Sequence, residues 1–168
     1  HPSKAEYHTA CAQVTHIASS NSSHEMDAAI PIAWDGESRM RVPKKLSSYM
    51  LGRLGEGLAK QYLVSHGWDV LSMNFACKIG EVDIIAVKEC TVAFVEVKTR
   101  TTKSLGPPLE AVDFRKQQRL KRIAQYYMSL IAAKFGGTDS LQIRFDVVTV
   151  IIDWPRGGEL YYLEDAFS

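Results

Sequence analysis

Apolar residues first recur with helical spacing just after Pro43, in the segment SSYMLGRLGEGLAKQYLVSHG. Its apolar stripe is formed by Leu51, Leu54, Leu58 and Tyr62. Ser47 or Ser48 can accept a hydrogen bond from the first turn, and Gly67 can close the last one. The pattern predicts a helix over about residues 47–67.

Three short runs of β-forming residues follow this helix: WDVLSMNFA, EVDIIAVK and TVAFVEVKTR. Lys78-Ile79-Gly80 separates the first two runs, and Glu89-Cys90 separates the last two. Short alternating runs with such brief connections are typical of consecutive strands. We expect a β-meander.

Helical spacing returns after Pro107-Pro108, from Leu109 to about Lys134, and Gly136-Gly137 ends it. The apolar face of this second helix comprises Leu120, Ile123, Ala124, Tyr127, Leu130 and Ile131. A further strand, LQIRFDVVTVII, and a short closing strand around ELYYL complete the pattern.

Residues 1–44 show no comparable periodicity, and the tract ASSNSSHEMDAA cannot bury enough apolar surface to offset its ordering entropy. We therefore expect a disordered N-terminal extension and one domain over residues 45–168. A chain of 168 residues suits a single core. No apolar run is long enough to cross a membrane, and no secretory signal is predicted.

Charge is spread unevenly along the chain. Residues 1–40 carry two basic and five acidic side chains, whereas residues 41–168 carry eighteen and fourteen. Within residues 98–122, Glu110 and Asp113 oppose eight cations: Lys98, Arg100, Lys103, Arg115, Lys116, Arg119, Lys121 and Arg122. Such a patch favours phosphate binding. Three sparse cysteines without a C-x-x-C pair favour a cytoplasmic protein without a zinc site.

The chemistry is indicated by charges on strands that are otherwise apolar. Alternation places Glu96 and Lys98 on the same face of TVAFVEVKTR, and Asp83 interrupts VDIIAV. An isolated E-x-K is more often a structural ion pair. If the two strands form a hairpin, however, Asp83 and Glu96 lie nearly opposite each other. Two such carboxylates repel unless a divalent cation lies between them, and Mg²⁺ accepts one or two carboxylates with retained waters.

Glu56 supplies a third acid, from a helix face whose other members are small or apolar: Gly52, Gly55, Ala59 and Leu63. Each glycine costs about 1 kcal/mol of helix stability relative to alanine. That cost is understandable if this face approaches the sheet closely and brings Glu56 to the carboxylate pair. The alternative is a solvated Glu56 with incidental glycines.

The basic residues of the second helix divide by face. Arg115, Arg119 and Arg122 form a stripe that is either a nucleic-acid contact or a solvated face. Lys116 shares the apolar stripe and should point toward the sheet, at the rim of the site. Arg144 and Asp146 favour a structural ion pair over a substrate contact.

Several of these segments, in this order, resemble the YraN-type family of small bacterial proteins: GRLGEGLAKQYL, Asn74, GEVDIIAV, FVEVKTR, Lys116, RFDVV and Ala166-Phe167. That family is similar to archaeal Holliday-junction resolvases of the PD-(D/E)XK nuclease superfamily. The likeness covers roughly residues 50–168. Val82 stands where the name-giving proline would be.

The resemblance implies an α/β fold of the restriction-endonuclease-like (PD-(D/E)XK) type, a mixed β-sheet flanked by helices in the order α-β-β-β-α-β. It implies catalytic roles for Glu56, Asp83, Glu96 and Lys98, with Asp83 and Glu96 holding Mg²⁺ or Mn²⁺. Lys116 matches the basic position on the helix after the hairpin. Together with the basic patch, it is expected to bind nucleic acid with Arg100, Arg115, Arg119 and Arg122.

These expectations lead to a metal-dependent endonuclease that hydrolyses phosphodiester bonds in DNA, in branched or distorted structures. The alternative is a non-catalytic nucleic-acid-binding or scaffold protein that retains the fold. A nucleotide-binding metabolic enzyme is disfavoured, since no glycine-rich phosphate loop follows the first strand. By analogy with resolvases, which act on symmetric junctions, we expect a homodimer.

Overall fold

The structure, a computed structural model, describes residues 45–101, 112–153 and 157–168. Its helices and strands follow one another as α2 (Ser48–Ser65), β1 (Asp69–Cys77), β2 (Gly80–Lys88), β3 (Thr91–Thr101), α3 (Phe114–Phe135), β4 (Gln142–Asp153) and β5 (Gly157–Phe167). The expected extension over residues 1–44 lies outside the described residues, as does the Pro107-Pro108 segment.

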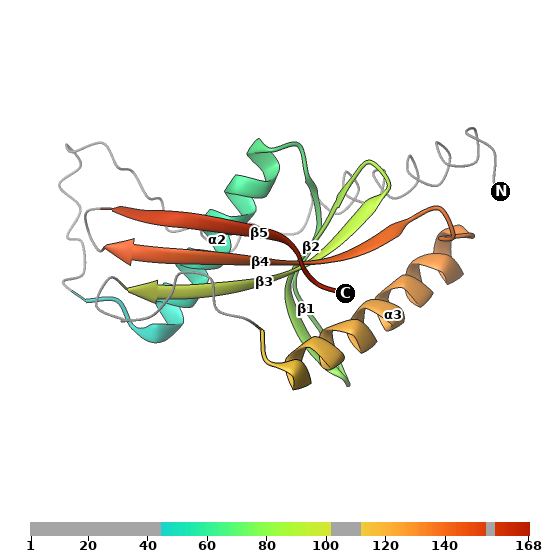
Figure 1. The fold of residues 1–168 in the computed structure, drawn as a ribbon, viewed down its shortest axis with the longest axis horizontal. Helices are drawn as coiled ribbons and strands as arrows, with labels where there is room; N and C mark the ends of the chain where they lie inside the picture. The colour runs from blue at the N-terminus through green and yellow to red at the C-terminus, as the bar shows by residue number, and fades with distance from the viewer. Residues whose placement is uncertain (1–44, 102–111, 154–156) are drawn as a thin grey trace.

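In the described part of the chain, a single sheet has the order β1-β2-β3-β4-β5. β1, β2 and β3 are antiparallel neighbours, which confirms the meander. β4 then pairs parallel to β3 along the whole of β3, and β5 returns antiparallel to β4. The sheet is therefore mixed and flanked by helices, as expected (Figure 1).

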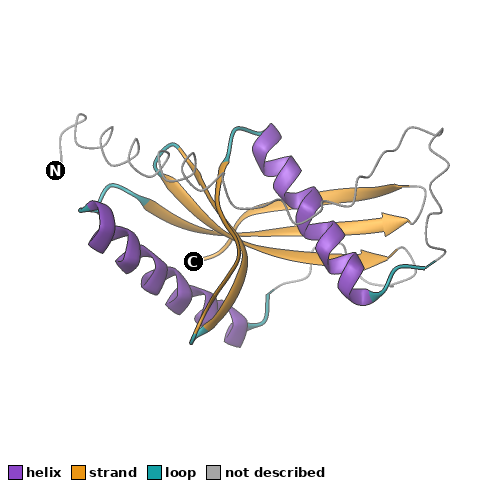
Figure 2. Cartoon of the chain, turned by 180° about the vertical axis from the view of Figure 1, so that it is seen from behind, coloured by secondary structure: helices purple, strands orange, loops and turns teal. Residues whose placement is uncertain are grey.

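The two helices lie against opposite faces of the sheet. One core cluster joins α3 to Val82, Phe94 and Phe145, and the other joins α2 to Ile84 and Val95. Figure 2 shows α2 crossing the strands on one side, with α3 set well apart from it. The alternating residues of the central strands thus bury both faces, which explains their nearly continuous apolar sequence.

Both helices begin at capped positions. The Ser47 side chain accepts a hydrogen bond from Met50 N at 3.2 Å, as expected for a cap. α3 is capped by Asp113 and begins at Phe114, so the predicted start at Leu109 was wrong by several residues. Leu109 itself lies outside the described residues. None of the described helices is both long and apolar enough to cross a membrane.

The buried face of α2 is the small-residue face. Its buried residues are Leu54, Gly55, Ala59 and Leu63, whereas Tyr62, from the predicted apolar stripe, is only partly covered. A Cβ atom on Gly55 would lie 1.9 Å from Thr99 Oγ1 in β3. Gly55 therefore permits the close approach of α2 to β3 that was inferred from the sequence. Gly52 faces open space, so a glycine is not needed there for this approach.

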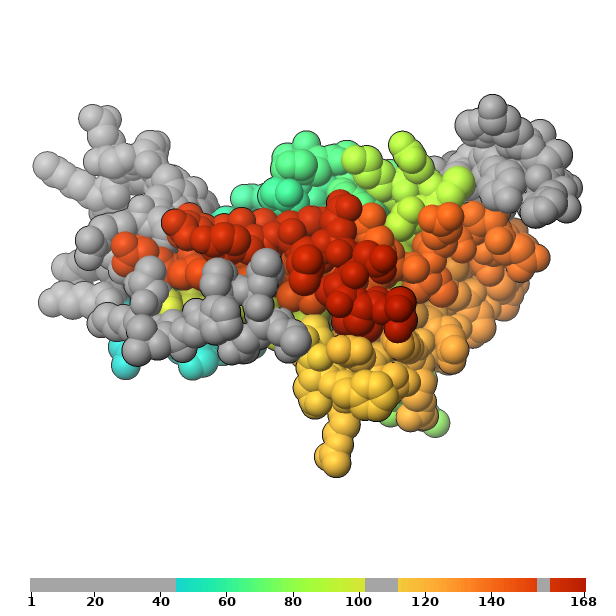
Figure 3. All heavy atoms as spheres, viewed as in Figure 1, coloured from blue at the N-terminus to red at the C-terminus, as the bar shows by residue number. Residues whose placement is uncertain are grey.

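The α3 face was predicted correctly apart from one position. Leu120, Ile123, Ala124, Tyr127 and Ile131 are buried, and Met128 joins them. Leu130 is instead 43% exposed. The end of β5 also packs on this side, where Phe167 stacks on Phe145 with ring centroids 4.9 Å apart. In the space-filling view, the red end of the chain lies just above the yellow beginning of α3 (Figure 3).

Candidate functional site

The candidate site lies where the β2–β3 ladder ends. The last paired residues are Ile84 and Val95, and Asp83 follows directly outside that pair. One carboxylate oxygen of Asp83 accepts a hydrogen bond from the backbone N–H of Val97 at 2.7 Å. A side chain therefore replaces the next backbone pairing, which fixes the position of this carboxylate between the two strands.

Asp83 carries a strongly perturbed carboxyl group. Burial is the largest cause, and the nearby charge of Glu96 is the second; with a smaller contribution from Glu56, they raise the pKa of Asp83 from 3.8 to about 7. The Val97 N–H and the Lys116 ammonium lower the pKa but do not offset this rise. Both repelling acids were named from the sequence.

Glu96 lies on the α3 face of β3 and is only 6% exposed. Lys116, from the first turns of α3, donates a hydrogen bond to Glu96 Oε1 and forms an ion pair with it. Lys116 therefore points toward the sheet, in agreement with its place on the apolar stripe. Its Nζ is paired with Glu96, and its charge acts on Asp83 only at longer range.

Glu56 projects from α2 and is held by Asn74, a residue that was not predicted to belong to the site. Asn74 Nδ2 donates to Glu56 Oε2 at 3.0 Å. Asn74 lies in β1 between Met73 and Phe75, whose partners flank Asp83, and its φ of 53° is uncommon outside glycine. A polar Asn between the apolar Met73 and Phe75 was the available signal.

The remaining predicted residues extend outward from this point. Lys98 and Arg100 follow Glu96 along β3, in register with Thr149 and Ile151 of β4, and both are partly exposed. Arg115, Arg119 and Arg122 are exposed along α3. The structure thus brings Glu56, Asp83, Glu96 and Lys116 together, while the three arginines form a separate surface beside them.

The donor chemistry of the site fits a hard divalent cation. Two carboxylates, one half-buried and one buried, face an electrostatic cost that an ion between them would remove. In the described part of the chain, no three His, Cys, Asp or Glu side chains are arranged to hold a metal. Mg²⁺ takes one or two protein carboxylates and keeps several waters, so the donors present would be enough for such an ion.

Arg144 and Asp146 form the structural ion pair that was expected from the sequence. Asp146 is 1% exposed and accepts from Arg144 at 2.8 and 2.9 Å, from the Tyr162 hydroxyl and from Asp165 N. The Arg144 guanidinium also lies 5.1 Å from the centre of the Trp68 ring. Every partner is satisfied, so this cluster ties β4 and β5 together.

The fold and site define a class of α/β protein: a mixed sheet between two helices, with repelling carboxylates where two central strands separate. The model described as "Uncharacterised protein family UPF0102" matches residues 55–150, and the chain belongs to that family. The YraN-type resemblance is thereby confirmed.

Similar proteins occur in several bacteria under the name "UPF0102 protein". The chain is 46% identical over 120 residues to one from Alkaliphilus metalliredigens, covering 71% of this chain and 99% of the relative. It is 41% identical over 118 residues to one from Caldicellulosiruptor bescii, covering 70% of this chain and 96% of the relative. The shared region therefore contains the candidate site.

Proposed function

We propose that this protein is a metal-dependent endonuclease of the PD-(D/E)XK type that hydrolyses phosphodiester bonds in DNA, in branched or distorted structures. The observation that carries the proposal is the Asp83 carboxylate, held by Val97 N–H beside Glu96 at the end of a buried ladder. Maintaining such repulsion inside a sheet costs stability, and a cation-binding function accounts for it.

In this proposal Asp83 and Glu96 hold Mg²⁺ or Mn²⁺. The ion, when bound, supplies Lewis-acid stabilisation of the phosphate and lowers the pKa of a water. Lys98 lies two residues beyond Glu96 and would contact the phosphate or the attacking water. Glu56, fixed by Asn74, keeps a further acceptor close to Asp83. Lys116, which is paired with Glu96 in this structure, would also be close enough to the site to contact the phosphate backbone.

The exposed arginines of α3 support a nucleic-acid substrate. Arg115, Arg119 and Arg122 recur at helical spacing on the surface of the same helix that carries Lys116. Phosphate contacts along this stripe, together with Arg100 on β3, would orient the backbone at the carboxylates. A cytoplasmic location and a homodimer that places two sites on a symmetric junction belong to the same proposal.

One observation favours a second candidate, a non-catalytic nucleic-acid-binding protein. Lys116 already neutralises Glu96. A protein that had only to bind phosphates could keep this ion pair as part of its structure and never exchange it for a metal. The two candidates differ in whether Asp83 and Glu96 are needed for cleavage of nucleic acid or contribute only to folding.

The experiment is cleavage of labelled branched, nicked, single-stranded and duplex DNA, with Mg²⁺ or Mn²⁺ titrated against each. We expect wild-type protein to cut a branched substrate and both Asp83→Ala and Glu96→Ala to abolish cutting. Lys98→Ala should reduce the rate by orders of magnitude but preserve metal binding, since the lysine would act on the water or the phosphate and not on the metal. Glu81→Ala is the matched control, because Glu81 is exposed two residues from Asp83.

Two outcomes would overturn the nuclease proposal. Equal cutting by wild type and Asp83→Ala would point to a contaminating nuclease. Binding of DNA without cutting of any structure at any metal concentration would leave the non-catalytic candidate.

A further inference from the structure

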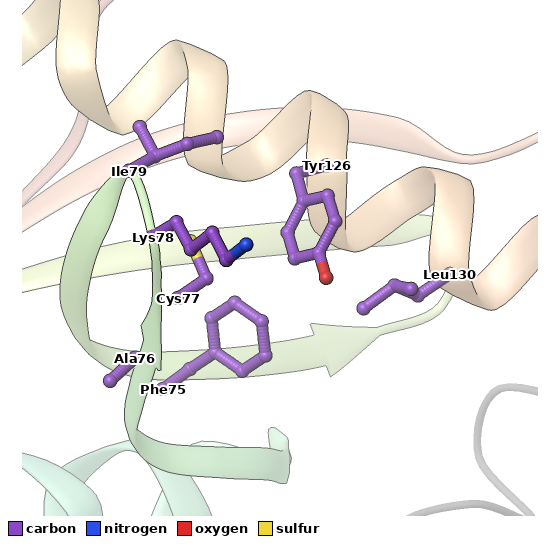
Figure 4. A pocket seen from close by; sticks show the side chains of 7 residues that line it. All are labelled: Phe75, Ala76, Cys77, Lys78, Ile79, Tyr126 and Leu130. Atoms are coloured by element: carbon purple, nitrogen blue, oxygen red, sulfur yellow. The ribbon is translucent and has the colours of Figure 1, made fainter.

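An open groove of about 430 Å³ lies between the β1–β2 turn and the second half of α3, and none of the candidate site residues lines it. Its lining is mainly apolar, with Phe75, Cys77 and Ile79 on one side and Tyr126 and Leu130 on the other. Figure 4 shows these side chains and Lys78 directed toward a common space. The volume is within the range of small-ligand sites.

Two features indicate that the groove is suited to a flat apolar group. Tyr126 and Leu130 are both 43% exposed, one helical turn apart on α3, although each is large and apolar. Phe75 packs against Tyr127, whose ring meets it edge-on with the ring centroids 5.0 Å apart. A rigid aromatic wall thus faces an exposed tyrosine, as in sites that stack a ring.

The charges around the groove are mainly positive. The helical stripe of Arg115, Arg119 and Arg122 continues, at the same spacing, into Tyr126 and Leu130. Arg119 also packs over the β1–β2 turn, since a Cβ atom on Gly80 would lie 2.9 Å from its Cδ. Lys78 lies in that turn, and the exposed Glu81 is the nearby acid.

We propose that this groove holds an unpaired base of a single-stranded nucleic-acid segment, stacked on Tyr126, while Lys78, Arg119 and Arg122 contact the adjoining phosphates. The inference rests on the proposed nucleic-acid function and specifies its substrate. An apolar slot with a cationic rim complements a nucleotide, which joins a flat ring to an anion. Tyr126 follows Lys116 by ten residue steps along α3, which is about 15 Å, so one strand can reach both the groove and the carboxylate site.

Binding in the groove can be followed at Cys77, because this residue is a partly exposed free thiol on the wall of the groove. The first experiment measures the rate of Cys77 alkylation by iodoacetamide, read from the Cys77 peptide by mass spectrometry. The probe is an unlabelled single-stranded oligothymidylate, with duplex DNA of equal length in parallel. We expect the single strand to slow alkylation and the duplex to have little effect.

The second experiment measures affinity by fluorescence anisotropy for the same two probes. Tyr126→Ala should lower the ratio of single-stranded to duplex affinity by about fivefold or more, since a stacked base is lost. Tyr126→Phe keeps the ring and should restore the ratio. Tyr49→Ala is the matched control, because Tyr49 is 75% exposed on α2, outside the groove.

The outcomes separate this inference from the function on which it rests. If single strands bind but neither Cys77 alkylation nor the Tyr126 substitutions respond, the groove proposal is overturned and the arginine surface remains. If alkylation slows as protein concentration rises without nucleic acid, a second copy covers the groove and the proposal is again wrong. If wild type binds no nucleic acid, both the groove and the proposed function fail.

Discussion

The metal-free protein should become more stable at neutral pH when Asp83 is replaced by Asn. Burial and the charge of Glu96 raise the pKa of Asp83 from 3.8 to about 7, so the folded state prefers the protonated carboxyl. Asn is neutral at every pH and nearly isosteric, and its side-chain oxygen can still accept the hydrogen bond from Val97 N–H. The substitution therefore removes the charge but keeps the contact.

The size of the effect follows from proton linkage. At 1.36 kcal/mol for each pKa unit, the rise corresponds to an upper limit of about 4 kcal/mol. Asp83 is only half-buried, so solvent screening should reduce the gain to about 1–3 kcal/mol. The contribution of Asp83 to wild-type stability is greatest below pH 4, where the carboxyl is protonated in both states, and falls as pH rises toward 7. The advantage of Asp83→Asn should grow across that interval and stay constant above it.

The assay is urea unfolding followed by far-UV circular dichroism, in EDTA, at intervals from pH 4 to pH 8.5. Asp139→Asn, at an exposed position beyond α3, controls for the same side-chain change. The reasoning would be refuted if the Asp83→Asn and wild-type curves ran parallel at every pH, because the carboxyl would then not be perturbed by folding.

Three further predictions concern other parts of the molecule. Gly55→Ala should destabilise the fold by about 1–3 kcal/mol in urea unfolding, because its Cβ would overlap Thr99 Oγ1; adding Thr99→Ala should recover only part of the loss, because Thr99 Cβ would still lie 2.9 Å from the new Cβ. Asp146→Ala should cost about 3–5 kcal/mol by the same assay, since it leaves the Arg144 charge without its buried partner. Replacing all three stripe arginines by Ala should weaken DNA binding similarly for all sequences and flatten its dependence on salt concentration; unchanged affinity in a salt titration would mean that the stripe is only a solvated face. This stripe comprises Arg115, Arg119 and Arg122.

The order of the elements could be predicted from the sequence because its signals are local. Alternation placed Glu96 on one face of β3, and the two-residue connection before Thr91 placed Asp83 almost opposite it. Glu56 was found by asking why a helix would keep small residues on one face. These arguments need only spacing and the cost of burying charge.

What the sequence could not supply depends on pairing between distant segments. The hydrogen bond from Asn74 to Glu56 requires a positive φ in β1, and nothing local demands that conformation. The exposure of Leu130 was missed because helical periodicity alone cannot show that an open groove lies beside this residue. The groove therefore became visible only when strand and helix were seen together.

The parallel pairing of β3 with β4 has a consequence for the order of folding. Thr91 pairs with Gln142, about fifty residues later, whereas the contacts of the β2–β3 hairpin are local and form sooner. The hairpin that brings Asp83 and Glu96 together should thus assemble before α3 delivers Lys116. Early in folding Asp83 would meet Glu96 before Lys116 is in place, so acidic conditions, which protonate Asp83, should speed formation of the hairpin.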